Sequence, residues 1–570
     1  MQRVLELVFR PTVPATRLAA TGVSAAAAPA APANSLTDAP VGASPDVARW
    51  LAVLANHAPL AGVRHDQAKF ALELHHCDDP PSGDPAWQCL VLDAGARRFA
   101  IAVHDWPVLP GLRVRSWEPV ALTRDQLPDF AGQCGDVPWR ADVERHWWRL
   151  DHDGAPLTIS LDAGVLSAPA TRDGAGADGG DGENGEDGAG RAGGERRSFV
   201  ELRISLELAD VDNPDDAAPD LYASPDADTR IELAARAVRL FDLALELNAD
   251  GLLTLVEHDA LTRASQSADK PRKAGPIDFG ARQTYASLAA AVARNVFAQW
   301  IANVQGVVEG QAIEYVHQMR IALRRMRTAY RFFGPELDAA ALVAEQKELK
   351  WIAALLGDVR DWDVLAEETF EAVARAAREA SAESPADVQA RDAAQWDAAR
   401  GRVAAHRARA AQALREAMTS PRYARLVMQI ARQVAVLVAQ AKNRRARPLN
   451  PDARRVLNKR YRKLARVADL ASLTPDARHQ VRIDAKRLRY AIEFLAPALD
   501  GRARRRMMAH VSVLQDTLGS ANDAIVGRRL LAEVELDAAV RMFTQGYLSA
   551  TEAHGVSGGK RELDRIRAKK

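Results

Sequence analysis

Hydrophobic positions between residues 1 and 262 recur with a period of two, the spacing of a β-strand with one buried face. Clusters of Gly, Pro and Asp separate the runs, as at turns between strands. Strands are expected at Val4–Phe9, Lys69–His75, Trp87–Asp93, Arg98–His104, Leu112–Trp117, His146–Leu150, Leu157–Leu161, Phe199–Leu208 and Leu252–Glu257. One amphipathic helix is expected at 227–247. The first half of the chain is therefore predicted to be an antiparallel β-domain.

From about residue 281 the hydrophobic period changes to 3.6 and alanine becomes abundant, which predicts an all-α domain. The expected helices span 281–306, 313–333, 341–356, 361–381, 386–418, 422–442, 451–469, 475–496, 502–518 and 522–549. Gly334–Pro335 and Pro497 follow two of these segments and should end them.

Segments of biased composition divide the chain further. Residues 263–280 are expected to be an interdomain linker between a domain at 1–262 and one at 281–555. Residues 20–46 are rich in Ala and Pro, and residues 172–195 are rich in Gly, Asp and Glu. Both segments have too few large apolar side chains to fold by burial, so we expect disordered insertions. The basic tail at 556–570 is expected to be frayed.

One helical segment occurs twice. HQMRIALRRMRTAYRFF begins at His317, and HQVRIDAKRLRYAIEFL begins at His479, an offset of 162 residues. The same offset carries Leu356–Gly357 onto Leu518–Gly519, and Asp361 onto Asp523. This agreement over two separate motifs indicates an internal duplication of a long helical unit.

Each copy has a basic face and an apolar face, because residues three and four apart share one side of a helix. The basic positions are His317, Arg320, Arg324, Arg327 and Arg331, and then His479, Arg482, Lys486 and Arg489. The apolar positions are Met319, Leu323, Met326, Tyr330 and Phe333, and then Val481, Leu488, Ile492 and Leu495. A third basic stripe comprises Arg455, Lys459, Arg462 and Arg466. Like charges at this spacing repel, so the stripes point to an anionic ligand, although a merely solvated face is the alternative.

The net charge of +1 conceals a division of charge. Residues 281–570 contain 50 Lys and Arg against 32 Asp and Glu, whereas residues 1–280 contain 26 against 43. This division favours an anion-binding helical domain and another task for the β-domain. Cys77, Cys89 and Cys134 have no metal-ligand spacing, and no apolar run reaches 18 residues. A cytoplasmic protein without a membrane span is expected.

The repeated helices, with LGDVRDWDVL (356–365) and LGSANDA (518–524) downstream, closely resemble the CHAD domain over about 278–555. The resemblance implies two four-helix bundles related by pseudo-twofold symmetry around a basic channel. It also implies binding of inorganic polyphosphate, and in several members location on polyphosphate granules. The residues implied to bind are His317, Arg320, Arg324, Arg325, Arg327, Arg331, His479, Arg482, Lys486, Arg487, Arg489, Arg455, Lys459 and Arg462. Asp361 and Asp523 are expected to hold motif arginines in position.

The β-domain resembles the CYTH fold, a triphosphate tunnel barrel, in the order of LPDF, HWWRLDHDG, LTISLDAG and VELRISLEL over 127–208. The resemblance therefore implies an antiparallel β-barrel. That family opens with E-x-E-x-K, whose matching positions here are Val4, Glu6 and Val8. Loss of metal ligands and phosphate counter-charges argues against phosphohydrolase activity. A residual site could comprise Glu6, Glu201, Glu207, Arg113, Arg115 and Arg149, with ordinary rim charges as the alternative.

Other chemistry has little support in the sequence. His317 and His479 each have Ile at the i+4 position and arginines nearby, so no metal site is expected. No P-loop, G-x-S-x-G or HExxH pattern occurs, and no catalytic residue or cofactor is predicted. Nucleic acid is a rival ligand, but single-strand readers interleave aromatic side chains with basic ones, and these stripes nearly lack them. The expected function is non-catalytic binding of polyphosphate. The alternatives are a triphosphatase that uses the barrel, and an interaction protein that recruits partners to granules.

Overall fold

The computed structural model describes residues 2–12, 45–55, 57–60, 62–75, 87–93, 98–121, 139–152, 154–168, 196–208, 227–265, 270–277, 284–334, 339–441, 449–467, 469–470, 472–499 and 501–568. The chain divides into two compact units. One comprises Met1–Lys270 with Ser420–Ala439, and the other comprises Pro271–Thr419 with Gln440–Lys570. The segment predicted to be disordered at 172–195 lies outside the described residues, as does 20–46 up to residue 44.

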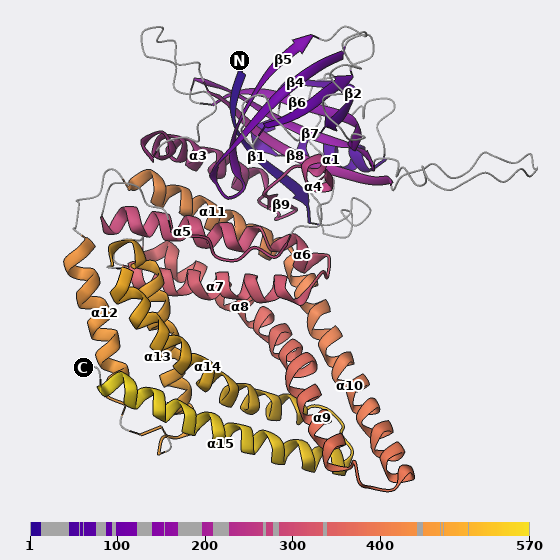
Figure 1. Cartoon of the computed structure of the whole chain (residues 1–570). Coiled ribbons are helices and arrows are strands. Elements are labelled where there is room, and N and C mark those ends of the chain that lie inside the picture. The colour runs from indigo at the N-terminus through magenta and orange to yellow at the C-terminus, as the bar shows by residue number, and fades with distance from the viewer. Residues whose placement is uncertain are drawn as a thin grey trace, which may run out of the picture. The chain divides into compact units, whose positions relative to one another are not determined.

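The first unit contains an antiparallel sheet (Figure 1). Its strand order is β5-β4-β3-β2-β6-β7-β8-β1-β9, and β1 pairs with β5 as well as with β8. The strands are β1 (Gln2–Pro11), β2 (His65–His75), β3 (Trp87–Asp93), β4 (Arg98–Leu109), β5 (Leu112–Ala121), β6 (Trp139–His152), β7 (Ala155–Ser167), β8 (Arg196–Leu208) and β9 (Leu253–Val256). Each predicted strand falls on an observed one, which confirms the period-two pattern.

Helices pack against this sheet. Helix α3 (Ala227–Leu247) contacts β1, β4 and β8 and has the predicted bounds. The short helix α4 (Ala260–Ser265) contacts β2, β6 and β7, with Leu261 buried among them. Helix α1 (Pro45–Ala55) and a 3-10 turn at Ala58–Leu60 were not expected. The amphipathic stretch that forms α1 directly follows the Ala/Pro-rich segment and was not recognised as a helix.

Helix α11 (Pro421–Gln440) belongs to the first unit, although the periodicity placed it with the helical domain. Arg432 forms an ion pair with Asp242 of α3, and Arg425 donates a hydrogen bond to the carbonyl of Ala249 at 3.1 Å. Sequence periodicity cannot predict such a contact. It shows which face of a helix is buried but not which element covers that face.

The second unit is helical. It contains α5 (Tyr285–Ile301), α6 (Val304–Val308), α7 (Ile313–Phe333), α8 (Ala339–Val364), a π-helix (Leu365–Thr369), α9 (Phe370–Ala380), α10 (Ala386–Met418), α12 (Leu449–Ala465), α13 (Pro475–Phe494), a 3-10 turn (Ala496–Ala498), α14 (Gly501–Leu531) and α15 (Ala538–Ala568). Contacts join α7 to α5 and α8, and α13 to α12 and α14. The molecule thus has an N-terminal antiparallel sheet and a C-terminal helical domain.

The predicted apolar faces form the core of the helical domain. Met319, Leu323 and Met326 of α7 have no exposed surface, and Leu488 and Ile492 of α13 have none either. Thr474 caps α13, where its hydroxyl accepts a hydrogen bond from the backbone N–H of Ala477 at 3.3 Å. Because the apolar face of each helix is buried in the core, the basic face lies on a different side of the helix.

Two expected helix boundaries were wrong. The chain stays helical through Gly357 and Gly519, whose positions leave room for a side chain, so neither glycine marks a break. The tail is not frayed, because α15 continues to Ala568. There Gly555 approaches the backbone of α14 closely, and Leu563 is buried. Gly555, a different glycine, thus allows α14 and α15 to pack tightly.

No helix among the described residues is both long and apolar enough to cross a membrane.

Candidate anion-binding site

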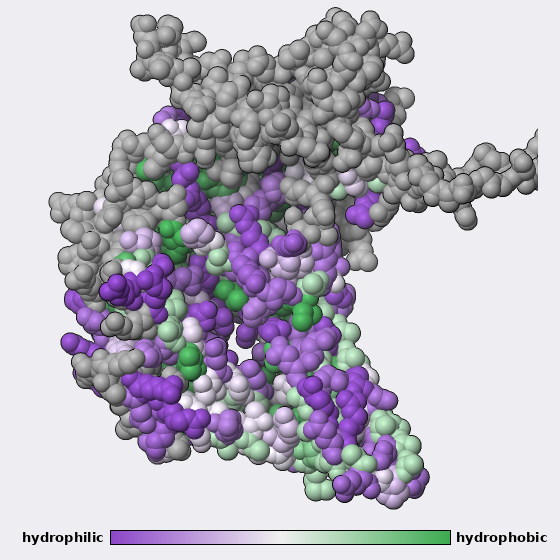
Figure 2. Space-filling model, in the orientation of Figure 1, coloured by the Kyte–Doolittle hydropathy of each residue, from purple (hydrophilic) through white to green (hydrophobic). Residues whose placement is uncertain are grey.

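A cavity of about 830 Å³ lies within the helical domain. Its walls come from α7, α8, α13 and α14, with Lys273, Ala274 and Gly275 of the predicted linker at its edge. Nine Lys and Arg line it against four Asp and Glu. The cations are Lys273, Arg320, Arg324, Arg325, Arg360, Arg482, Lys486, Arg489 and Arg529. Figure 2 shows mainly hydrophilic residues around the hollow in this domain.

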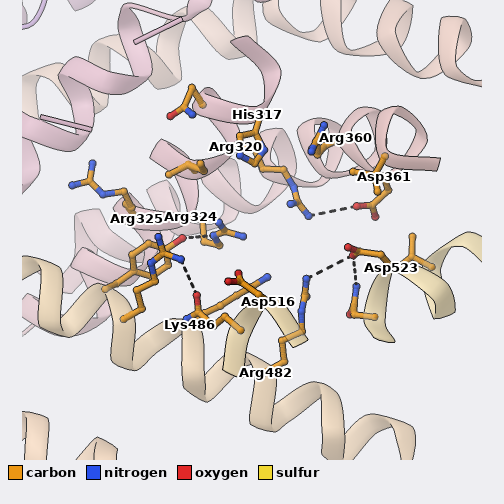
Figure 3. A pocket seen from close by; sticks show the side chains of 18 of the residues that line it. His317, Arg320, Arg324, Arg325, Arg360, Asp361, Arg482, Lys486, Asp516 and Asp523 are labelled. Carbon is orange, nitrogen blue, oxygen red and sulfur yellow. Dashed lines mark hydrogen bonds and ion pairs between the residues drawn. The ribbon is translucent and has the colours of Figure 1, made fainter. Parts of the chain in front are cut away.

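Two ion pairs occupy equivalent positions of the repeat. Arg320 of α7 lies 3.6 Å from Asp361 of α8, and Arg482 of α13 lies 4.0 Å from Asp523 of α14 (Figure 3). Both partners are related by the 162-residue offset. These ion pairs confirm that each aspartate contacts a motif arginine, and both arginines line the cavity.

Lys486 lies among these arginines and has no ion-pair partner among the described residues. Burial, followed by the charges of Arg324, Arg482 and Arg320, lowers its pKa to about 6, and Asp523 opposes the shift only weakly. Burial and Arg324 also lower the pKa of Arg320. The cavity is thus short of negative charge, the condition in which a bound anion is favoured.

Arg324 occupies the middle of the cavity wall (Figure 3). Its Nε donates a hydrogen bond to the hydroxyl of Tyr490, and its guanidinium carbon lies 5.6 Å from the centre of that ring. Arg489 donates to Gln515 at 3.1 Å. These contacts orient both side chains from one edge, leaving their other N–H groups for a ligand.

The two repeat histidines line the cavity in different surroundings. His317 is half-buried, and its pKa is lowered by burial and by the nearby Arg360. His479 is exposed and lies 3.3 Å from the side chain of Asn522. Asn522 occupies the position that Arg360 has in the first copy. The two histidines therefore have unequal electrostatic surroundings.

Of the predicted binding arginines, one borders the cavity but is engaged by the protein itself, and two do not line the cavity. Arg325 is 1% exposed and is held by Gln299, Asn295 and Glu493, so its guanidinium serves the fold. Arg327 and Arg331 do not line the cavity, although they share a helix with residues that do. A stripe on a helix spans a wide arc, and only part of that arc faces the cavity.

The third basic stripe lines a separate groove between α12 and α13. The groove has a volume of about 920 Å³ and is lined by Arg455, Val456, Asn458, Lys459, Arg460, Arg462, Lys463, Arg466, Asp484 and Arg487. Arg487 faces this groove, whereas Lys486 before it faces the cavity. The predicted binding residues are therefore divided between two basic surfaces, with Arg327 and Arg331 lining neither.

Sequence reasoning missed several cavity residues. Arg360 and Arg529 lie on α8 and α14, and Arg529 is 3.8 Å from Asp361. A signal for Arg360 existed, because it directly precedes the repeated aspartate. No sequence signal identified Lys273, since the linker segment that contains it has no hydrophobic periodicity. The side chain of Asn303, between α5 and α6, holds this segment in place. It accepts a hydrogen bond from the backbone N–H of Arg272 and donates one to the backbone carbonyl of the same residue.

The residual site considered for the β-domain is an internally neutralised ion network. Arg115 contacts Glu6 at 3.3 Å and Asp259 at 2.8 Å, while Arg203 contacts Asp162 at 2.9 Å and Glu201 at 3.3 Å. Burial would raise the pKa of Asp259, yet Arg115 and Arg203 hold it well below its usual value. Sequence reasoning missed Asp162, Arg203 and Asp259 as members of this network.

Other members of that predicted site are placed differently. Arg149 is exposed, and Glu207 is half-buried. Among the described residues, no group of three or more His, Cys, Asp or Glu is arranged to hold a metal ion. The carboxylates of the network are instead engaged by arginines, which leaves them poorly suited as metal ligands.

Comparison with known families identifies the helical region. Residues 291–532 match the family model of the CHAD domain. The chain contains a CHAD domain. Its cavity is formed by the two repeats that carried the resemblance in the sequence. The match does not extend to the β-domain, whose likeness to CYTH proteins stays a prediction.

Two solved structures are similar to the chain. The CHAD domain from the plant Ricinus communis has 25% identity and a TM-score of 0.42, and the match covers 53% of this chain and 99% of the other. PptA from Streptomyces chartreusis has 20% identity and a TM-score of 0.36, and the match covers 50% and 99% respectively. No curated protein matches the chain.

Proposed function

We propose that this protein binds inorganic polyphosphate without transforming it, in the cavity of its CHAD domain. The observation that carries the proposal is the cluster of Arg320, Arg324, Arg482 and Lys486, which two facing helices direct into one cavity. CHAD domains are linked to polyphosphate binding in general. Phosphate oxygens accept hydrogen bonds from guanidinium groups at well-defined angles, so arginines fixed by Asp361 and Asp523 are preorganised for them.

The lining favours a phosphate chain over nucleic acid. Apart from the imidazoles of His317 and His479, Tyr490 is the aromatic residue among the described residues that line the cavity, and Arg324 already contacts its hydroxyl and ring. Binding of single-stranded nucleic acid depends on free aromatic faces on which bases stack. A polymer without bases requires only positive charges and hydrogen-bond donors.

The alternative function is hydrolysis of triphosphate in the β-domain, which would be an antiparallel barrel of the CYTH type. The β1–β5 pairing supports such a barrel. The chemistry is less favourable, because Arg115 and Arg203 are engaged by carboxylates of the same interior. A substrate would have to break these pairs before it could be bound. We therefore place the binding function in the CHAD domain and propose association with polyphosphate granules as its consequence.

A double variant tests the proposal. Arg320→Gln/Arg482→Gln removes one charge from each repeat, and the full-length protein should bind polyphosphate at least about 30-fold more weakly, from about 1–3 kcal/mol per charged hydrogen bond lost. Arg391→Gln/Arg402→Gln removes two exposed charges of α10 and should have little effect. Equal affinity of both variants for polyphosphate by calorimetry, with unchanged circular dichroism, would contradict the proposal.

A further inference from the structure

The groove between α12 and α13 carries positive charge that the acidic side chains lining it do not balance. Of the described residues that line it, seven are Lys or Arg and one, Asp484, is acidic. Asp484 pairs with Lys463 at 2.7 Å and with Arg487 at 3.4 Å. Lys459 and Arg462 of α12, and Arg466 directly after its end, are exposed and form no ion pair with any residue that the structure describes.

Some of this charge is also held away from water. Arg460 is half-buried, its guanidinium carbon lies 5.5 Å from the centre of the Phe332 ring, and burial together with Arg487 lowers its pKa. Concentrating like charges on one surface costs free energy unless an anion offsets it. No aromatic residue is among the described residues that line the groove, and single-stranded nucleic acid depends on aromatic faces on which its bases stack.

The groove and the cavity share helix α13. Lys486 lines the cavity and Arg487 lines the groove, and consecutive residues of a helix point about 100° apart. The two basic surfaces are therefore separated by little more than one helix, whose diameter with side chains is about 10–12 Å. A long, flexible polyanion can span a separation of this size.

We propose that the α12–α13 groove is a second polyphosphate-binding site, and that one long chain occupies the cavity and the groove together. The proposal rests on the function assigned to the cavity. It implies selectivity for chain length, because a chain that reaches both sites gains affinity from the high effective concentration of its second segment. A short chain binds each site singly.

Calorimetry on the full-length protein with tripolyphosphate and with a long polyphosphate tests the groove. The variant Lys459→Gln/Arg462→Gln/Arg466→Gln should bind the long chain about 10- to 100-fold more weakly. It should bind one tripolyphosphate where the unaltered protein binds two. The slope of log K against log salt for the long chain should also become shallower by about 2, for three lost charges.

The matched control is Arg391→Gln/Arg402→Gln/Arg409→Gln, which removes three exposed charges from α10. Equal losses in the two triple variants, or no loss in the groove variant, would overturn the second site. Tighter binding of single-stranded RNA than of polyphosphate to the groove would overturn the ligand assigned to it. Loss in the groove variant with none in Arg320→Gln/Arg482→Gln would instead refute the cavity as the primary site. All variants should retain the circular dichroism of the unaltered protein.

Discussion

At the scale of single residues, position around a helix decides which arginines can meet a ligand. Arg324 lines the cavity beside Tyr490, whereas Arg327, one turn further along α7, does not line it. Burial and the neighbouring Arg331 lower the pKa of Arg327, but its charge lies away from the cavity. The two residues have the same chemistry on the same helix, so they form a natural pair for comparison.

Arg324→Ala is expected to weaken polyphosphate binding by about 1–3 kcal/mol, because a charged hydrogen bond is lost in a partly buried site. Arg327→Ala should change it by less than about 0.5 kcal/mol. Titration calorimetry of the two variants provides the comparison. Equal effects would show that only the overall charge of α7 matters.

Lys486 should make binding depend on pH. Its pKa of about 6 in the unliganded protein leaves it mostly neutral at pH 7, and a bound anion favours its protonated form. The complex then holds more protons than the free protein, so affinity for polyphosphate should strengthen as pH falls from about 8 to 6. Lys486→Met should flatten this dependence, while His317→Ala/His479→Ala should leave a substantial part of it. Loss of the whole dependence in the histidine variant would assign it to the imidazoles instead.

The same residue links pH to stability. Between about pH 6 and 10.5 Lys486 binds fewer protons in the folded protein than in the unfolded chain, so its contribution to the free energy of unfolding rises with pH over this window. Lys486→Met should therefore stabilise the unliganded protein at pH 7, by about 1–3 kcal/mol. Urea unfolding at several pH values measures this. A variant less stable than the unaltered protein at pH 7 would contradict the lowered pKa.

At the scale of elements, the contact between α14 and α15 depends on glycine. A Cβ atom at Gly555 would lie 2.9 Å from the Cβ of Ala521 and 3.1 Å from the carbonyl oxygen of Thr517. Backbone atoms cannot move aside without shifting the helix. Gly546 lies on the same helix with open space around it.

Gly555→Ala is therefore expected to lower the free energy of unfolding by about 1–3 kcal/mol, since an added methyl group overpacks the interface. Gly546→Ala should raise it by about 0.5–1 kcal/mol through the higher helix propensity of alanine. Thermal unfolding of both variants shows whether each substitution raises or lowers the stability of the protein. A stabilising effect at Gly555 would mean that α15 can move away from α14 at little cost.

At the scale of the whole molecule, charge is separated between the two halves of the sequence. The helical half carries the excess of Lys and Arg, and the β-domain neutralises its buried arginines with its own carboxylates. Binding of a phosphate polymer should release counterions from the polymer, and log K should fall with log salt with a slope of several units. An affinity independent of salt would refute binding through the basic cavity and groove.

The local pattern of the sequence determined which residues are buried in each helix and strand. The apolar face of α7 was predicted from its spacing, and Met319 and Leu323 are buried. That Asp361 and Asp523 contact motif arginines was predicted from two motifs repeated at one offset, and the structure identifies these arginines as Arg320 and Arg482. Even the strands of the β-domain followed from alternation, because burial of one face fixes the period of a strand whatever it packs against.

Only the tertiary structure decided what each polar residue faces. Arg325 is in the core beside Glu493, and Arg487 and Lys486 line two different surfaces, though all three belong to one repeated motif. In the β-domain, Glu6 meets Arg115 across paired strands more than a hundred residues apart. Periodicity shows which residues share a face of a helix or strand, because the geometry of that element depends on residues close together in the sequence. The neighbour of each face, and with it the burial, pKa and accessibility of a charge, arises from contacts that are not local.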